Sequence, residues 1–383
     1  MSHNFDHFLP KLTRIDVKYH GRHVGVLAQS SDSQACYFEY TDEWLHHGFS
    51  ISSISLPLEK RVYKSSSSLP EGIFGVFRDS LPDDWGRLVV DRQLTAAGIN
   101  PSQLSQLSRL SLVGDTGLGA LEYFPSYQVY EEDARIDYDV LARECQSLME
   151  MHDIEQLDVL FRYGRSSGGA RPKVMVDIDD EPWIVKFPTR IDGMNSGLKE
   201  YHCALTARKC GIVMEEVRLL PSKECDGYFA TKRFDRKSVG GLLSKMHMTS
   251  AAALLEASPF DVMDYRDLMK LSLTLTNSVS SSEQLFRVMC FNVFAGNCDD
   301  HSRNFSFIYD ENTREWSLSP AYDLTIDDGF MGEHSTLVNG KGSDIELEDL
   351  VKVGMFGGIS SRKCNEIVRE IKSIVGQELG LAR

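Results

Sequence analysis

Short apolar runs that alternate with turn residues characterise the beginning of the chain. Apolar stretches at residues 15–17 and 24–26 flank a turn at residues 19–22 that contains a glycine. Strands with one buried face produce such an alternation, and turn formers separate them. We therefore predict a small antiparallel sheet within residues 15–60.

Helical periodicity follows this region. Residues 71–112 carry apolar side chains three to five positions apart, among them Trp85, Val89 and Leu94, as expected for one face of a helix. The same criterion predicts further helices at residues 138–151, 197–210, 249–257, 265–276, 282–295 and 354–380. Two runs rich in aromatic and aliphatic residues, 305–309 and 316–319, flank a polar segment and predict a β-hairpin.

Polar residues suited to metal binding lie at both ends of this hairpin. Asn304 follows Asp299 by five positions and precedes the first strand, whereas Asp323 follows the second strand. A hairpin returns its two ends to one place, so we expect Asn304 and Asp323 to lie side by side. In a kinase catalytic loop, an Asp at this spacing orients the attacking hydroxyl and the Asn binds Mg²⁺. The pattern predicts a magnesium–nucleotide site, and an acidic surface turn is the alternative.

A lysine and a glutamate upstream extend the kinase pattern. Lys186 interrupts the apolar run at residues 183–187, and Glu200 follows it within the helix predicted at residues 197–210. An ammonium group in an apolar strand is costly to bury unless it meets an anion such as a nucleotide phosphate. Protein kinases use a strand lysine paired with a helix glutamate to position phosphates. An edge-strand lysine that faces water is the alternative.

A stretch of small residues precedes this strand. Residues 166–173 read Ser-Ser-Gly-Gly-Ala-Arg-Pro-Lys between runs that we interpret as strands. Small residues let backbone N–H groups approach phosphate oxygens, so the segment is a candidate phosphate-covering loop. A glycine hairpin turn explains it equally well. The order of the signals favours a kinase: glycine loop, strand lysine, helix glutamate, catalytic Asp and Asn, second Asp.

These motifs together resemble the HipA toxin kinases of bacterial toxin–antitoxin modules. The resemblance rests on residues 166–173, 185–188, 232–236, 299–304 and 322–323. Residues from about 15 to 127, which include the segment at 77–85, are similar to the N-terminal subdomain of full-length members. The chain departs from the family pattern at Arg171-Pro172, at Lys232 and in a shorter C-terminal region. These departures weaken any inference from the family to this chain's nucleotide affinity and protein substrate.

The resemblance implies roles for individual residues. Asp299 would be the catalytic residue and Asn304 and Asp323 the Mg²⁺ ligands. Ser166, or Ser167 beside it, would be phosphorylated by the enzyme itself, which expels the loop and inactivates the kinase. The implied nucleotide-binding residues are Gly168, Gly169, Ala170, Arg171, Lys173, Lys186, Glu200, Lys232, Arg233, Phe234, His301, Asn304, Tyr322 and Asp323.

Composition narrows the class of protein. The 383 residues carry a net charge of −15, which argues against unaided binding to DNA or RNA, because counterion release needs a basic face. The eight cysteines form no CxxC pair, so we expect reduced thiols in a cytoplasmic protein and neither a zinc site nor a disulfide framework. No apolar run is long enough to span a membrane, and the first residues lack the features of a secretory signal.

We expect an α+β, two-lobed protein-kinase-like fold with a small β-rich N-terminal subdomain and a mainly helical C-terminal lobe. The predicted parts are residues 1–130, 131–240 and 241–383. The predicted activity is that of an ATP- and Mg²⁺-dependent protein serine/threonine kinase toxin. By resemblance alone, its partners are a small helix-turn-helix antitoxin of the HipB type, DNA only through that antitoxin, and a protein substrate such as an aminoacyl-tRNA synthetase. The alternatives are a small-molecule kinase, a nucleotide-binding co-regulator of transcription with little turnover, and a metal phosphohydrolase.

Overall fold

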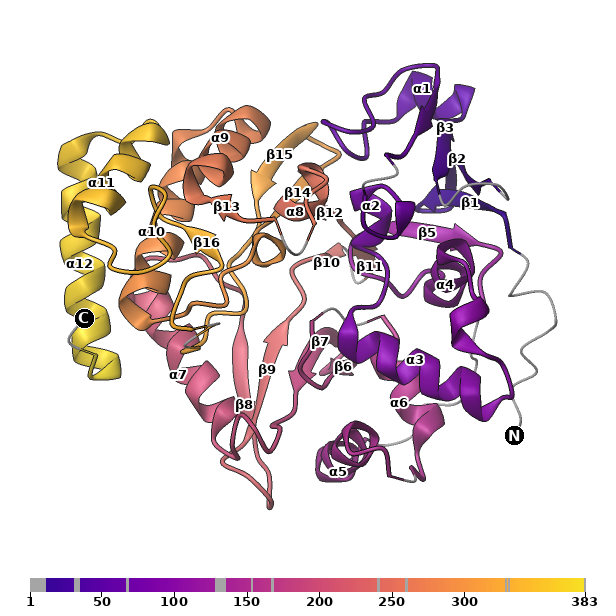
Figure 1. Cartoon of the computed structure of the whole chain (residues 1–383), viewed down its shortest axis with the longest axis horizontal. Helices are drawn as coiled ribbons and strands as arrows, with labels where there is room; N and C mark the ends of the chain where they lie inside the picture. Colours follow the sequence, from indigo (N-terminus) through magenta and orange to yellow (C-terminus); the bar gives the residue numbers. More distant parts are fainter. Residues whose placement is uncertain are drawn as a thin grey trace. The chain divides into compact units, whose positions relative to one another are not determined.

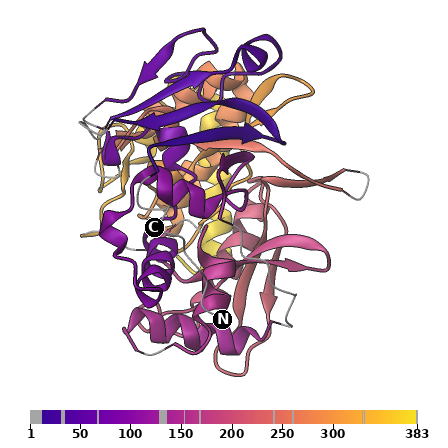
Figure 2. The ribbon, with the colours of Figure 1, turned by 90° about the vertical axis from the view of Figure 1, so that its right-hand side faces the viewer.

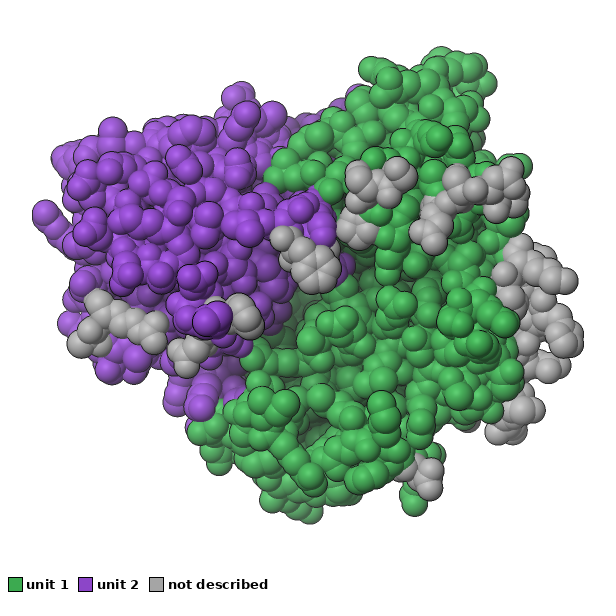
Figure 3. Space-filling model, in the orientation of Figure 1, with its two compact units in different colours: residues 1–195, 220–247, 253–256 green, residues 196–219, 248–252, 257–383 purple. Residues whose placement is uncertain are grey.

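The computed structural model describes residues 12–30, 35–66, 69–127, 136–152, 154–166, 169–239, 242–258, 261–327, 329 and 331–381. The chain forms two compact units, coloured separately in Figure 3. Unit 1 comprises residues 1–195, 220–247 and 253–256, and unit 2 comprises residues 196–219, 248–252 and 257–383. The three-part division of the chain stays a prediction.

Unit 1 begins with the predicted antiparallel sheet, which has five strands in the order β4-β3-β2-β1-β5 (Figure 1). Along β1, alternate side chains are buried, which is the expected pattern for a strand with one face on a core. The strands are β1 (Arg14–Tyr19), β2 (Arg22–Gln29), β3 (Cys36–Tyr40), β4 (Val62–Lys64) and β5 (Leu121–Phe124).

Helices complete the N-terminal part and connect it to a second sheet. The single helical stretch expected at residues 71–112 forms α-helix only at residues 75–78, 84–96 and 106–113. The last two are separated by Gly98, whose φ of 79° disfavours helix continuation, and by Pro101, which starts a short helical turn of its own. The helices are α1 (Asp42–His47), α2 (Gly75–Arg78), α3 (Asp84–Ala96), α4 (Gln106–Val113), α5 (Tyr138–Met149) and α6 (Leu157–Gly164).

The second sheet of unit 1 carries the predicted lysine strand. Strands β6 (Lys173–Ile178), β7 (Glu181–Lys186) and β9 (Tyr228–Lys232) pair in antiparallel fashion, in that order. Trp85 of α3, Phe161 of α6 and Trp183 of β7 belong to one buried apolar cluster. The N-terminal helix α3 therefore shares a core with the lysine strand. Strands β10 (Arg236–Val239) and β11 (Leu242–Lys245) form a separate hairpin, seen at the right of Figure 2.

Unit 2 is mainly helical. Helix α10 (Val279–Ala295) packs against α9 (Tyr265–Thr276), α11 (Leu347–Phe356) and α12 (Ser361–Leu379), and α12 also contacts α7 (Ser196–Lys209). The predicted hairpin is confirmed as β14 (Ser306–Asp310) and β15 (Glu315–Leu318), which join β12 (His247–Ser250) in one sheet. The remaining elements are β8 (Val217–Leu220), α8 (Ala251–Leu254), β13 (Met263–Asp264) and β16 (Thr336–Leu337).

Two helix predictions need correction. The helix expected at residues 249–257 is replaced by the end of β12 and the short α8, because β12 pairs with β14 at a distant position in the sequence. The helix expected at residues 354–380 is two helices, α11 and α12, separated near Gly358, whose φ of 81° disfavours helix continuation. No described helix is both long and apolar enough to cross a membrane.

Candidate active site

The predicted catalytic loop begins where α10 ends. Gly296, with a φ of 70°, caps the helix, and its left-handed conformation turns the chain out of the helical path. Two backbone hydrogen bonds then hold Cys298: its N–H donates to the Asp327 carbonyl oxygen at 2.8 Å, and its own carbonyl accepts from Ser335 at 2.9 Å. The loop is thus fixed by a segment that follows it by some thirty residues.

The two adjacent aspartates of this loop have opposite environments. The Asp299 side chain is 51% exposed and lies 3.9 Å from Nε2 of His301. Asp300 is fully buried. An exposed carboxylate can meet an acceptor hydroxyl, whereas a buried one that is already hydrogen-bonded cannot. The geometry therefore favours Asp299 as the catalytic residue.

Asp300 has a structural role that the sequence did not reveal. Its Oδ2 accepts from the Tyr265 hydroxyl at 2.7 Å and lies 3.0 Å from Nδ1 of His334, while Oδ1 accepts from the Thr336 N–H at 3.1 Å. Asn292 extends this network by donating to the Tyr265 hydroxyl at 3.0 Å. A buried carboxylate with all these partners makes the loop rigid.

The predicted metal ligands lie on segments that hydrogen bonds connect. The Tyr322 hydroxyl donates to the Arg303 carbonyl oxygen at 2.7 Å and lies 2.6 Å from the Ser306 hydroxyl. Tyr322, which precedes Asp323, is thus hydrogen-bonded to Arg303 and Ser306, which flank the segment Asn304–Phe305. Asp323 itself has a φ of 57°, a left-handed conformation that costs free energy and often marks functional positions.

Oxygen ligands at this place suit Mg²⁺. Nδ2 of Asn304 donates to the Asp299 carbonyl oxygen at 2.8 Å, which leaves Oδ1 as the ligand atom. Among the described residues, no three His, Cys, Asp or Glu side chains are grouped to hold a metal ion. Mg²⁺ commonly binds through one or two protein oxygens together with substrate phosphates and water, so Asn304 and Asp323 fit it. Nδ1 of His301 is buried without a hydrogen-bond partner in the part described, as expected where a ligand completes a site.

Two lysines occupy one rung of the second sheet. Lys173, 7% exposed, and Lys186 are direct partners across β6 and β7. Two lysines at paired positions concentrate positive charge on one part of the sheet, which favours the approach of an anion. The ammonium group of Lys186 also lies 5.6 Å from the ring centre of Phe229. The pair is a candidate for contacts with nucleotide phosphates. Glu200 is buried in α7 of unit 2, and its pairing with Lys186 stays a prediction.

The glycine-rich loop is described from Gly169 onward, and Ser167 and Gly168 lie outside the described residues. The run before the loop is helix α6, not the strand we expected. Ser166 is 6% exposed, and its hydroxyl lies 2.6 Å from that of Thr116. Ala170 is exposed, and Arg171 forms an ion pair with Asp192 at 3.2 Å.

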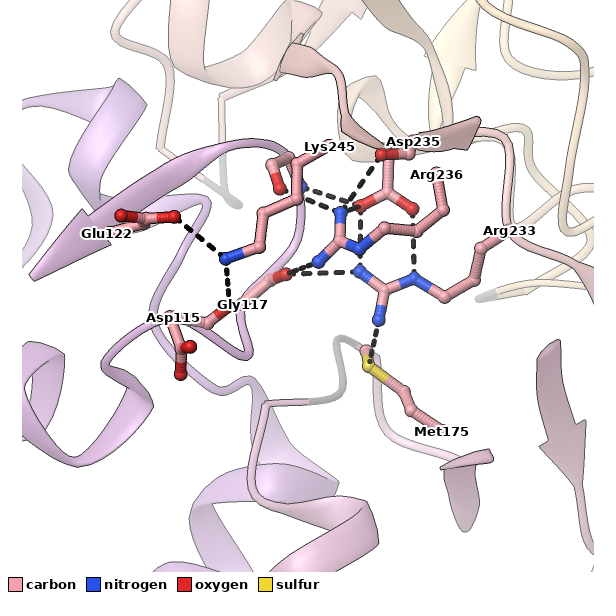
Figure 4. Close-up of polar contacts among 9 residues, drawn as sticks. Asp115, Gly117, Glu122, Met175, Arg233, Asp235, Arg236 and Lys245 are labelled. Atoms are coloured by element: carbon pink, nitrogen blue, oxygen red, sulfur yellow. Dashed lines mark hydrogen bonds and ion pairs between the residues drawn. The ribbon is translucent and has the colours of Figure 1, made fainter. Parts of the chain in front are cut away.

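Side chains of the predicted hinge have other partners (Figure 4). Nη2 of Arg233 donates to the Gly117 carbonyl oxygen at 3.1 Å and to Asp235 at 2.8 Å, and Lys232 forms an ion pair with Glu181. Phe234 is half-buried. The hinge backbone is engaged as well, because the Arg233 N–H donates to the Pro182 carbonyl oxygen at 2.9 Å. The role of residues 232–234 in adenine binding stays a prediction.

Asp235 is the centre of this arrangement. Its carboxylate is 2% exposed, lies 2.7 Å from Nη1 of Arg236, and accepts from the Gly119 N–H at 2.7 Å. Burial alone would raise the pKa of Asp235, but the guanidinium groups of Arg233 and Arg236 outweigh it and lower the pKa to about 2. The hinge is thereby joined to the segment that leads into β5 of the N-terminal sheet.

Family models match both parts of the chain. The HipA-like C-terminal domain matches residues 165–378, and the HipA N-terminal domain matches residues 15–124. The chain belongs to the HipA family. The C-terminal model includes every predicted site residue, whereas Thr116 and the Gly117–Gly119 segment come from the N-terminal model.

Individual HipA-like proteins are similar over most of their length. Two proteins of Sinorhizobium fredii with provisional kinase names, Y4dM and Y4mE, are 26% and 24% identical over 345 and 347 residues. These alignments span 82% and 81% of this chain and 78% and 76% of the relatives. HipA of Shewanella oneidensis MR-1, solved with HipB and operator DNA, superimposes with a TM-score of 0.71 at 16% identity, covering 96% of this chain and 90% of that one. The predicted two-lobed HipA-like α+β fold is confirmed.

Proposed function

We propose that this HipA family member is an ATP- and Mg²⁺-dependent protein serine/threonine kinase and the toxin of a toxin–antitoxin module. The observation that carries the proposal is the different placement of Asp299 and Asp300: one carboxylate is exposed at the loop, and its neighbour is buried to hold the loop in place. The provisional kinase names of the Sinorhizobium relatives support the same class.

Each site residue has one task in phosphoryl transfer. Asn304 and Asp323 would hold Mg²⁺, which neutralises charge on the phosphates when bound. Lys186 and Lys173 would offset the negative charge of the phosphates from the sheet. The carboxylate of Asp299 would orient the acceptor hydroxyl and accept its proton. Positioning and electrostatic stabilisation provide most of the catalysis in this reaction class.

Ser166, with Ser167 as the alternative, is the proposed site of self-inactivation. A phosphate on Ser166 adds nearly two negative charges to a buried position in the glycine-rich loop. A phosphoserine at this position would compete with the nucleotide phosphates for the same lysines. The negatively charged nucleotide would also repel the phosphoserine. Displacement of the loop would relieve this repulsion and stop the reaction.

The proposed partner is a small DNA-binding antitoxin, through which the chain would meet DNA. The Shewanella HipA was solved with HipB and operator DNA, which supports a partner of this kind. The net charge of −15 favours a basic protein as the direct contact. A translation protein such as an aminoacyl-tRNA synthetase is the proposed substrate, and the cytoplasm the proposed compartment.

Intact-mass analysis after incubation with Mg-ATP tests this function. We expect the wild-type chain to gain one phosphoryl group and the Asp299→Asn variant to gain none. Wild-type mass gain by Asp299→Asn would overturn the assignment of the catalytic residue. Mg-ATP binding without any transfer to protein would favour the co-regulator or the small-molecule kinase.

A further inference from the structure

Asp83 stands at the N-terminus of α3 but does not cap it. An Asp at this position normally accepts a hydrogen bond from the second or third N–H of its own helix. No such bond forms here, and Oδ2 of Asp83 instead accepts from the N–H of Gly169 at 2.9 Å. A residue of the N-terminal HipA domain thus binds the backbone of the glycine-rich loop.

Trp85 holds the same loop at two further points. Its backbone N–H donates to the Gly169 carbonyl oxygen at 3.2 Å, and its indole Nε1 donates to the Lys173 carbonyl oxygen at 2.8 Å. Trp85 is 1% exposed and belongs to the apolar cluster that includes Phe161 and Trp183. Because its ring is locked in a core, Trp85 provides a rigid anchor for both ends of the segment 169–173.

Gly169 requires the conformation that these contacts fix. Its φ is 86°, and a Cβ on it would lie 2.7 Å from the ammonium nitrogen of Lys173. The Lys173 ammonium therefore lies against Gly169, and Lys173 is the cross-strand partner of Lys186. Asp83 and Trp85 contact the backbone of this loop at Gly169 and Lys173.

We propose that Asp83 and Trp85 are positioning residues for nucleotide binding, which keep the glycine-rich loop and Lys173 in the geometry that receives the phosphates of a nucleoside triphosphate. The inference rests on the proposed kinase function and assigns part of the nucleotide-binding machinery to the N-terminal domain. In this arrangement the Gly169 N–H is committed to Asp83. The phosphates are received by the lysines and by the loop N–H groups beyond Gly169.

The test compares Asp83→Ala with Asp84→Ala in the full chain. Asp84 is the adjacent carboxylate and is exposed, so it matches the charge change without touching the loop. Hydrogen exchange of the peptide at residues 163–173 reports loop order without nucleotide, and calorimetry reports Mg-ATP affinity. Losing a hydrogen bond to a charged group corresponds to roughly a tenfold change in an equilibrium constant. We expect faster exchange and about tenfold weaker Mg-ATP binding in Asp83→Ala alone.

Two further variants separate positioning from general stability. Asp83→Asn keeps an oxygen acceptor for the Gly169 N–H and should restore most of the affinity. Trp85→Phe keeps an aromatic ring in the core but removes the indole donor to Lys173, and should raise the KM for ATP more than it lowers kcat. Melting temperatures identify any variant that has lost its fold.

The outcomes decide between the inference and the proposed function. Unchanged exchange and unchanged Mg-ATP affinity in Asp83→Ala would overturn the positioning role while leaving the kinase intact. Faster exchange with wild-type affinity would also overturn it, because loop order would then not matter for the nucleotide. A wild-type chain that binds no Mg-ATP would overturn the proposed function, and with it the nucleotide role of Asp83.

Discussion

The hydroxyl of Ser166 donates a hydrogen bond to the hydroxyl oxygen of Thr116, across 2.6 Å. The direction follows from a second contact, because the Thr116 hydroxyl donates its own proton to the Val113 carbonyl oxygen at 2.8 Å. The proposed acceptor of the self-directed phosphoryl transfer is therefore buried, and its proton is engaged by the N-terminal domain. Phosphorylation of Ser166 requires this contact to break first.

Replacing Thr116 with Val removes the acceptor but keeps the shape of the side chain. We expect label from γ-labelled ATP to enter residues 163–173 several-fold faster, since Ser166 loses about 1 kcal/mol of hydrogen bonding that holds it in place. Thr95→Val, at an exposed position of α3, is the control. An unchanged or slower rate in Thr116→Val would show that release from Thr116 does not limit the modification.

The neighbouring aspartates of the catalytic loop should respond differently to the same change. Asp299→Asn should abolish phosphoryl transfer without altering the melting temperature, because its carboxylate is exposed. Asp300→Asn should lower the free energy of unfolding by about 3 kcal/mol, because it disrupts a buried hydrogen-bonded group. Chemical denaturation and label transfer measure the two effects. Equal loss of stability in both variants would contradict the assignment.

Lys186→Met tests the lysine rung. Removing the Lys186 ammonium should weaken Mg-ATP binding at least tenfold, because a positive charge proposed to contact the nucleotide phosphates is lost. The melting temperature should change little, because Lys186 is only partly buried. Calorimetry and thermal melts measure these quantities. Lys223→Met, at an exposed position, is the control. Unaltered affinity in Lys186→Met would favour the plain edge-strand interpretation.

Stability should fall in weakly acidic solution because of His247. This ring is fully buried, its Nε2 donates to the Ile51 carbonyl oxygen at 2.8 Å, and burial lowers its pKa to about 4. An unfolded histidine titrates near 6.5, so the unfolded state binds an extra proton between about pH 6.5 and 4. Stability is thus full above pH 6.5 and decreases by as much as about 3 kcal/mol as the pH falls to 4.

Urea denaturation of His247→Leu and of the exposed control His46→Gln measures this contribution. Between pH 7 and 5, His247→Leu should lose part of the pH dependence and His46→Gln should keep it. The pKa of Asp235 adds a second, lower range: a depressed carboxyl pKa stabilises the fold above about pH 4, and this contribution is lost towards pH 2. Identical pH profiles for the two histidine variants would contradict the role of His247.

The partner model makes a prediction about DNA. The purified chain should give no mobility shift on the operator upstream of its own gene at physiological salt, because a net charge of −15 disfavours contact with DNA phosphates. Adding the neighbouring small antitoxin should give a shifted complex that contains both proteins and weakens with salt. Tight sequence-specific binding by this chain alone would favour the co-regulator hypothesis.

The β14–β15 hairpin could be predicted from the sequence because it depends on residues that are close together in the chain. The environments of the site residues depend on long-range contacts. Asp299 and Asp300 look alike in the sequence, since the partners that bury Asp300 lie on α9 and in the segment that ends in β16. Similarly, the link from Asp83 to Gly169 joins positions 86 residues apart. From the sequence alone, an Asp-Asp-Trp run at the start of a helix predicts an N-terminal cap and not a contact with a distant loop.

The apolar cluster around Trp183 limits how this protein can be divided. Leu94 and Trp85 enclose it from α3, whereas Val174 and Tyr228 enclose it from the sheet. A fragment started after the N-terminal HipA domain would expose one side of this cluster to water, and large apolar patches of that kind cause aggregation. Expression trials of the isolated C-terminal region therefore need α3 supplied as well, either in the same chain or as a separately produced N-terminal domain that can dock.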